Sequence, residues 1–296
     1  MITKTSIHAL IKLMDDPDPM VVQHAREKLV EYGENIIPDL EVLEEDCFID
    51  PNQLDNITRV LELLRFQRVK HALSTWLKSD EKNLMQAVYV ICSYQFPDLT
   101  IQDFTAQFQS LRHQCWMEIN SRQTSFEKVE ALNKIFFDEF DFVRVNELPH
   151  SPFEIFVNSV METKEGTDIS LGLIYSLVAQ SLDIPIYGVT TMNNRAPFVL
   201  AYMDKDNLLP ILDWGIDNNG VLFYIGVGTK GLIVDPKQLR EIYLSEGLPQ
   251  SRAQFEPSPN TLIIKKYLKD IKRSYSNQAQ FRYKLKDIEE LLELFR

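Results

Sequence analysis

The chain has 296 residues, of which 45% are hydrophobic and 25% charged, so it can bury an ordinary core. Its formal net charge of −12 argues against general affinity for nucleic acid, and no window approaches the ~18 apolar residues of a membrane span. The three cysteines are widely spaced, as is typical of reduced thiols, and the N-terminus lacks a secretion signal, so we expect a cytoplasmic protein.

The pattern of residues 1 to about 110 predicts helices throughout, beginning with apolar residues at helical spacing from Ile7 to Met14. We expect Asp18 to be the N-cap of the next helix with Pro19 at its first position, and Gly33 to end it. This stretch, "DDPDPMVVQHAREKLVEYGENIIPDL", resembles one HEAT-type repeat, but no array of such units follows.

Beyond residue 138 the pattern changes from all-helical to one apolar helix followed by short β-rich runs, which predicts an α+β fold with an antiparallel sheet. The predicted domains are a helical region over 1–110, a core over 111–245 and a C-terminal helical hairpin over 246–296. The elements expected by residue range are helices 53–77, 81–93, 100–120, 125–137, 170–182, 259–275 and 278–295, and strands 184–191, 198–203, 208–212, 221–225 and 232–234.

Residues 260–296 contain nine Lys or Arg against five Asp or Glu, so this segment is +4 while the remainder is −16. Two solvated helix faces explain this asymmetry more simply than a docking surface does.

The segment "YIGVGTKGLIVDP" contains G-x-G-x-x-G at 226–231, the spacing of a dinucleotide-binding turn. That fingerprint requires a helix directly after the glycines, because the pyrophosphate sits on the N–H groups of the helix N-terminus. Here Leu232-Ile233-Val234 follows, so we predict a hairpin between two strands and no nucleotide site.

The segment "FVNSVMETKEGTDISLGLIYSLVAQSLDIPIYGV", residues 156–189, resembles the transglutaminase-like superfamily. Its likeness is to the SirB-type branch, in which an N-S…E-x-x-x-G-x-x-x-S-L motif precedes such a helix. The resemblance implies a papain-like core in which a cysteine opens the helix, a histidine comes from the next strand, and an Asp or Asn from the following strand orients the histidine.

On this chain the same motif places Asp168 at the cysteine position, Pro197 at the histidine position and Gly226 at the acidic position. None of the three suits the chemistry. Independently of the motif, residues 151–296 contain neither Cys nor His, so this segment cannot itself form a Cys–His pair. We therefore expect the triad to be lost, with His150 able to contribute only from a loop, and the glycine-rich turn to be flexible.

The first functional hypothesis is a non-catalytic binding or scaffold protein that recognises an unknown protein or peptide, with no nucleic acid, membrane, metal or cofactor. The expected binding residues are Asn158, Asp168, Ser170, Pro197 and Trp214.

The alternative is an atypical hydrolase or acyl-transferase that uses Ser170 as its nucleophile. Against that alternative, we expect Asp168 or Ser170 simply to cap the helix. The naming of the family also suggests regulation of gene expression, although the charge gives no support for direct DNA binding.

Overall fold

The computed structural model describes residues 4–45, 50–146, 150–190, 197–204 and 220–296. The chain divides into two compact units, Met1–Thr75 with Ser93–Pro97 and Trp76–Cys92 with Asp98–Arg296. The domain bounds expected near residues 110 and 245 stay a prediction. The expected strand over 208–212 and Trp214 lie outside the described residues.

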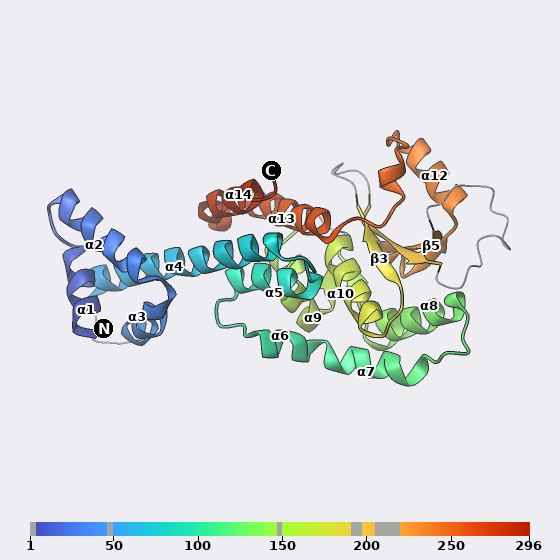
Figure 1. The fold of residues 1–296 in the computed structure, drawn as a ribbon, viewed down its shortest axis with the longest axis horizontal. Helices are drawn as coiled ribbons and strands as arrows, with labels where there is room; N and C mark the ends of the chain where they lie inside the picture. Colours follow the sequence, from blue (N-terminus) through green and yellow to red (C-terminus); the bar gives the residue numbers. More distant parts are fainter. Residues whose placement is uncertain (1–3, 46–49, 147–149, 191–196, 205–219) are drawn as a thin grey trace. The chain divides into compact units, whose positions relative to one another are not determined.

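The first unit is helical, as predicted, and its helices are α1 (Lys4–Leu13), α2 (Pro19–Tyr32), α3 (Ile37–Glu44) and the first part of α4 (Pro51–Lys78) (Figure 1). The predicted start of α2 is confirmed, because the Asp18 carboxylate accepts a hydrogen bond from Met20 N at 2.9 Å. Its predicted end is confirmed too, since Gly33 has a φ of 64°. Ile7, Leu29 and Leu61 belong to the apolar core that these helices share.

The second unit contains helices and a small sheet (Figure 1). They are α5 (Leu84–Gln95), which ends in the first unit, α6 (Ile101–Gln107), α7 (Gln109–Glu118), α8 (Ser125–Asn133), α9 (Val157–Thr163), α10 (Asp168–Ser181), α12 (Pro236–Ser245), α13 (Asn260–Asn277) and α14 (Leu285–Glu293). The helix predicted over 100–120 is two helices that meet at Phe108. Neither α9 nor α12 was predicted, although Asp235 caps α12 in a capping box with Gln238.

Within the described residues, the sheet has four antiparallel strands in the order β3 (Ile186–Val189), β4 (Val199–Met203), β5 (Val221–Gly226) and β6 (Leu232–Val234). This confirms the predicted antiparallel sheet after an apolar helix. It also confirms that the glycine-rich turn closes a hairpin, since β6 and not a helix follows the glycines.

Helix α10 packs on β3 and β4, and α12 packs on β5 (Figure 1). Gly172 lies so close to Phe198 and Leu200 that an added Cβ would contact both side chains. Successive strand residues face opposite sides of a sheet. Accordingly, Val199 and Ala201 belong to the apolar cluster on the other face, which includes residues of α12. Residues 169–179 of α10 are all buried, so the helix is held firmly with Asp168 as its first residue.

A second sheet, which the sequence did not predict, places an arginine beside the start of α10. Strand β1 (Val143–Arg144) pairs in parallel with β2 (Glu165–Gly166), and Arg144 lies opposite Gly166. Only Thr167 separates β2 from α10, so this pairing fixes the backbone of Arg144 near Asp168.

Among the described residues, no helix combines the length and the apolar character that crossing a membrane requires.

Candidate functional site

The N-terminus of α10 is organised by Thr167, which is its N-cap residue. The Thr167 side chain makes no cap hydrogen bond; its hydroxyl instead lies 2.9 Å from the Ser170 hydroxyl. The expectation that Asp168 or Ser170 caps this helix is therefore wrong. The physical reason is the loop at Glu154 and Ile155, whose carbonyl oxygens give the buried Ser170 hydroxyl nearby acceptors.

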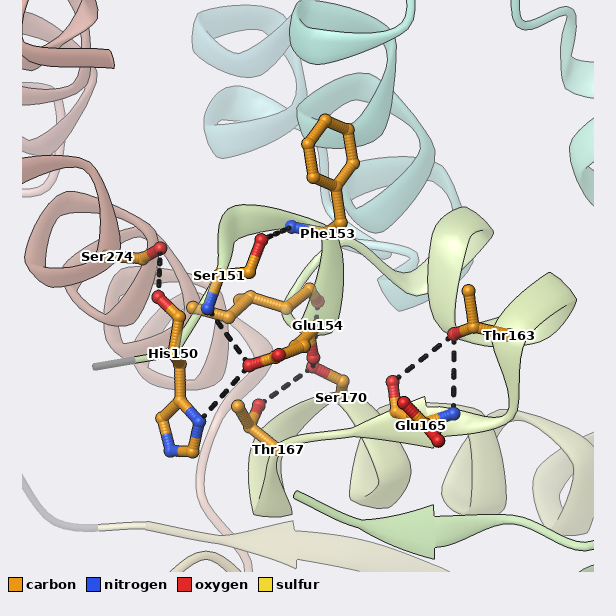
Figure 2. Close-up of polar contacts among 10 residues, drawn as sticks. His150, Ser151, Phe153, Glu154, Thr163, Glu165, Thr167, Ser170 and Ser274 are labelled. Atoms are coloured by element: carbon orange, nitrogen blue, oxygen red, sulfur yellow. Dashed lines mark hydrogen bonds and ion pairs between the residues drawn. The ribbon is translucent and has the colours of Figure 1, made fainter. Parts of the chain in front are cut away.

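Ser170 is completely buried, and its hydroxyl is used in that loop contact (Figure 2). Its Oγ lies 2.7 Å from the Ile155 carbonyl oxygen, to which it donates, and 3.3 Å from that of Glu154. A serine nucleophile needs a base within hydrogen-bond reach and access for substrate. Within the described residues, Ser170 Oγ contacts two carbonyl oxygens and a hydroxyl, so this geometry gives the Ser170 hypothesis no support.

Asp168 forms an ion pair with Arg144, with 2.8 Å between Oδ1 and Nε. Burial raises the pKa of Asp168, and the nearby Arg144 charge opposes this shift only in part. Asp168 Oδ1 is buried without an aligned hydrogen bond, so the contact with Arg144 is ionic in character. The carboxylate at the start of α10 is thus held in place and partly desolvated.

The glycine-rich turn packs against this ion pair. A Cβ added at Gly228 would contact Asp168 Oδ1 and would lie 2.9 Å from Arg144 Cδ. Further along, the Gly231 carbonyl oxygen accepts a hydrogen bond from Asn133 Nδ2 at 2.9 Å, and Tyr175 donates to Asn133 Oδ1. The expectation of an unconstrained turn is therefore wrong, because close packing requires glycine at two of its positions.

A pocket of about 230 Å³ opens beside Asp168. The ionisable side chains that line it are Arg144, His150, Asp168, Lys266, Asp270 and Arg273. Lys266 is only 5% exposed and pairs with Asp270 at 2.7 Å, one helical turn further along α13. Pro197 is exposed and also lines the pocket.

His150 reaches this pocket from the segment before α9 (Figure 2). Its carbonyl oxygen accepts a hydrogen bond from Ser274 Oγ at 2.8 Å, and its Nδ1 lies 3.4 Å from Glu154 Oε2. The Nδ1 atom is buried and has no aligned hydrogen bond. The Ser274 hydroxyl donates to a backbone carbonyl, so it does not form a nucleophile–base pair with the imidazole.

The expected site residues are only partly brought together. Asp168 and Pro197 both line the pocket, whereas Ser170 does not line it and Asn158 is buried in α9. Gly226 does not line the pocket; its turn reaches Asp168 through Gly228. Among the described residues, no three His, Cys, Asp or Glu side chains are grouped as metal ligands.

Sequence reasoning missed most of the charged residues of the pocket. Lys266, Asp270 and Arg273 are spaced by four and three residues, so a helical pattern places them on one face. The excess positive charge of residues 260–296 was a usable signal for this face. Arg144 gave no comparable signal, because the β1–β2 pairing that positions it joins two segments twenty residues apart.

An apolar helix packed on an antiparallel sheet, with a pocket at the N-terminus of the helix, defines the class of fold. The profile of the transglutaminase-like superfamily matches residues 102–269, more than half of the chain. The chain therefore belongs to the transglutaminase-like superfamily.

Two relatives match the chain over part of its length. The "UPF0162 protein" of Xylella fastidiosa strain 9a5c is 24% identical over 200 residues, which cover 66% of this chain and 65% of that protein. The protein of the same name from strain Temecula1 / ATCC 700964 matches with the same identity and coverage. The match thus spans just under two thirds of the length of these relatives. No solved structure matches the chain.

Proposed function

We propose that this chain is a non-catalytic member of its superfamily, of the SirB type, that binds a protein or peptide in the pocket beside Asp168. The observation that carries the proposal is that an Asp168–Arg144 ion pair, covered by Gly228, stands where the motif would place a thiolate. The proposal includes a HEAT-like region, domains at 1–110, 111–245 and 246–296 with a C-terminal helical hairpin, and a cytoplasmic location.

The proposal predicts that the two described cysteines have no reactive thiol. Cys92 and Cys115 are buried, and burial raises the pKa of Cys92 to about 11 and that of Cys115 to about 12. Thiolate is the reactive form of cysteine. We expect a Cys47→Ser variant, which retains only these two thiols, to resist alkylation by iodoacetamide at pH 7.5 when native and to react when unfolded in guanidinium. Rapid alkylation of either cysteine in the native chain would contradict the proposal.

Binding is tested with a displayed library of random peptides selected on the full chain. Dissociation constants of enriched peptides are then measured by fluorescence anisotropy for the wild type, Arg144→Ala and Arg59→Ala. Arg59 pairs with Asp55 at 2.7 Å on α4 and both side chains are exposed, so its replacement is a matched control that removes another Asp–Arg pair. We expect Arg144→Ala to weaken binding about tenfold and Arg59→Ala to leave it unchanged. The proposal fails if no peptide is enriched above blank resin, or if Arg144→Ala binds as the wild type does.

A further inference from the structure

The charges that line the pocket do not cancel. Asp168 pairs with Arg144, and Asp270 pairs with Lys266. Arg273 is exposed and forms no ion pair with any described residue. Among the described residues that line the pocket, three cationic side chains therefore face two carboxylates, so these residues carry a net charge of +1 when His150 is neutral.

Helix α13 supplies most of this charge from a single face. Lys266, Asp270, Arg273 and Asn277 lie at positions i, i+4, i+7 and i+11, and all four line the pocket. The pocket thus lies against the basic segment of a chain whose net charge is −12. An excess of one sign of charge in a concave site favours a ligand group of the opposite sign.

Donor groups also remain for such a ligand. Arg144 contacts Asp168 through Nε, and its two Nη groups make no hydrogen bond or ion pair with a described residue. The Arg273 guanidinium is likewise unpaired within the described part of the chain. Guanidinium groups bind planar carboxylates through two parallel hydrogen bonds.

The charge balance favours a carboxylate over a phosphate. One carboxylate neutralises the +1 pocket, whereas a phosphate dianion would leave an excess negative charge close to Asp168 and Asp270. An uncompensated charge in a partly buried site is costly. A pocket of about 230 Å³ has room for a carboxylate with a short aliphatic stem.

We propose that this pocket binds a carboxylate of an acidic peptide, held by the guanidinium groups of Arg144 and Arg273. The inference rests on the proposed function, since it names the chemistry of the peptide that the pocket takes. The carboxylate is that of an Asp or Glu side chain or of a peptide C-terminus.

The test is an NMR titration of the full chain, following backbone amides and arginine Nε–H signals. The probes are N-acetyl-glutamate α-amide for a side-chain carboxylate, N-acetyl-glycine for a C-terminal carboxylate, N-acetyl-glutamine α-amide as the neutral isostere, and inorganic phosphate. We expect at least one carboxylate to shift the signals of Thr167, Ile169 and Arg273 with a dissociation constant in the millimolar range. The glutamine probe and phosphate are expected to bind at least about tenfold more weakly.

Two variants distinguish binding in the pocket from a general effect of the protein's charge. Arg273→Gln should weaken carboxylate binding about tenfold. Arg282→Gln removes the same charge from an exposed position outside the pocket and should have no effect. The inference fails if both variants weaken carboxylate binding equally, or if no carboxylate shifts the NMR signals. It also fails if phosphate or the glutamine probe binds more tightly than the carboxylates do. If selected peptides need Arg144 but bind equally well after their carboxylates are amidated, the proposed function stands and this inference alone fails.

Discussion

Asp168 is subject to two opposing influences. Burial disfavours its charged form, while Arg144 at 2.8 Å favours it, and burial prevails, so the pKa of the carboxyl is raised. A structural carboxylate at the first position of a helix would ordinarily gain from the helix dipole. Perturbed pKa values are common among functional groups in clefts, so the raised pKa of Asp168 supports the binding role proposed for it.

This shift predicts a pH-dependent effect of Asp168→Asn on stability. Because the folded chain binds this proton more tightly than the unfolded chain does, the associated stabilisation is complete below the ordinary pKa of 3.8. It is lost as the pH rises through the raised pKa of the folded chain. Asparagine stays neutral and has no such loss. We expect the free energy of unfolding of the variant, relative to wild type, to increase between pH 4 and pH 7 in urea denaturation. A difference that stays level or falls over that range would contradict this account.

At the scale of elements, the sequence pattern identified the β5–β6 hairpin correctly but gave the wrong reason for its glycines. The strand after the turn was visible from its β-branched residues and its length. The close approach of Gly228 to Asp168, and of Gly231 to Asn133, depends on α8 and α10, which are distant in sequence. No local pattern reports such contacts.

We predict that Gly231→Ala destabilises the second unit more than Gly247→Ala does. Both glycines have positive φ, 75° and 64°, but an added Cβ would clash with the Asn133 side chain at Gly231 and meet nothing within 4 Å at Gly247. Backbone strain alone costs about 1 kcal/mol, and strain plus overpacking about 3 kcal/mol. Urea denaturation measures both variants. Equal losses of stability would show that the turn is not tightly packed on Asn133.

Elements with local signals were predicted well, and those without were not. The Asp18 cap, the apolar stripe of α1 and strand β6 follow from a few adjacent residues. Strand β1, by contrast, is two residues long and exists only because it pairs with β2. Helix α12 is a different case, because Asp235, Pro236 and Gln238 form a local start signal within the sequence.

At the scale of the whole molecule, the first unit has a core of its own. The cluster that contains Leu29 consists of residues from the first unit alone. Leu29 is fully buried, so Leu29→Ala should cost about 2–5 kcal/mol in that unit. We expect hydrogen exchange to become faster in α1, α2 and α3 and to stay unchanged in α10, β4 and β5.

Leu13→Ala is the control for this prediction, because Leu13 lies in the same unit with 42% of its surface exposed. Leu13→Ala should change hydrogen exchange only slightly in all of these elements. Equal acceleration in α10 after Leu29→Ala would mean that the two units unfold together.

The sequence by itself determined the helical first region, the helix that leads into an antiparallel sheet, and the absence of Cys and His after residue 150. These follow from periodicity, capping residues and composition, which are local properties. Tertiary structure alone decided that Ser170 is buried, that Arg144 pairs with Asp168, and that one face of α13 completes the pocket. Each of these depends on contacts between segments distant in the chain, because burial and charge pairing are properties of the packed molecule and not of any one segment.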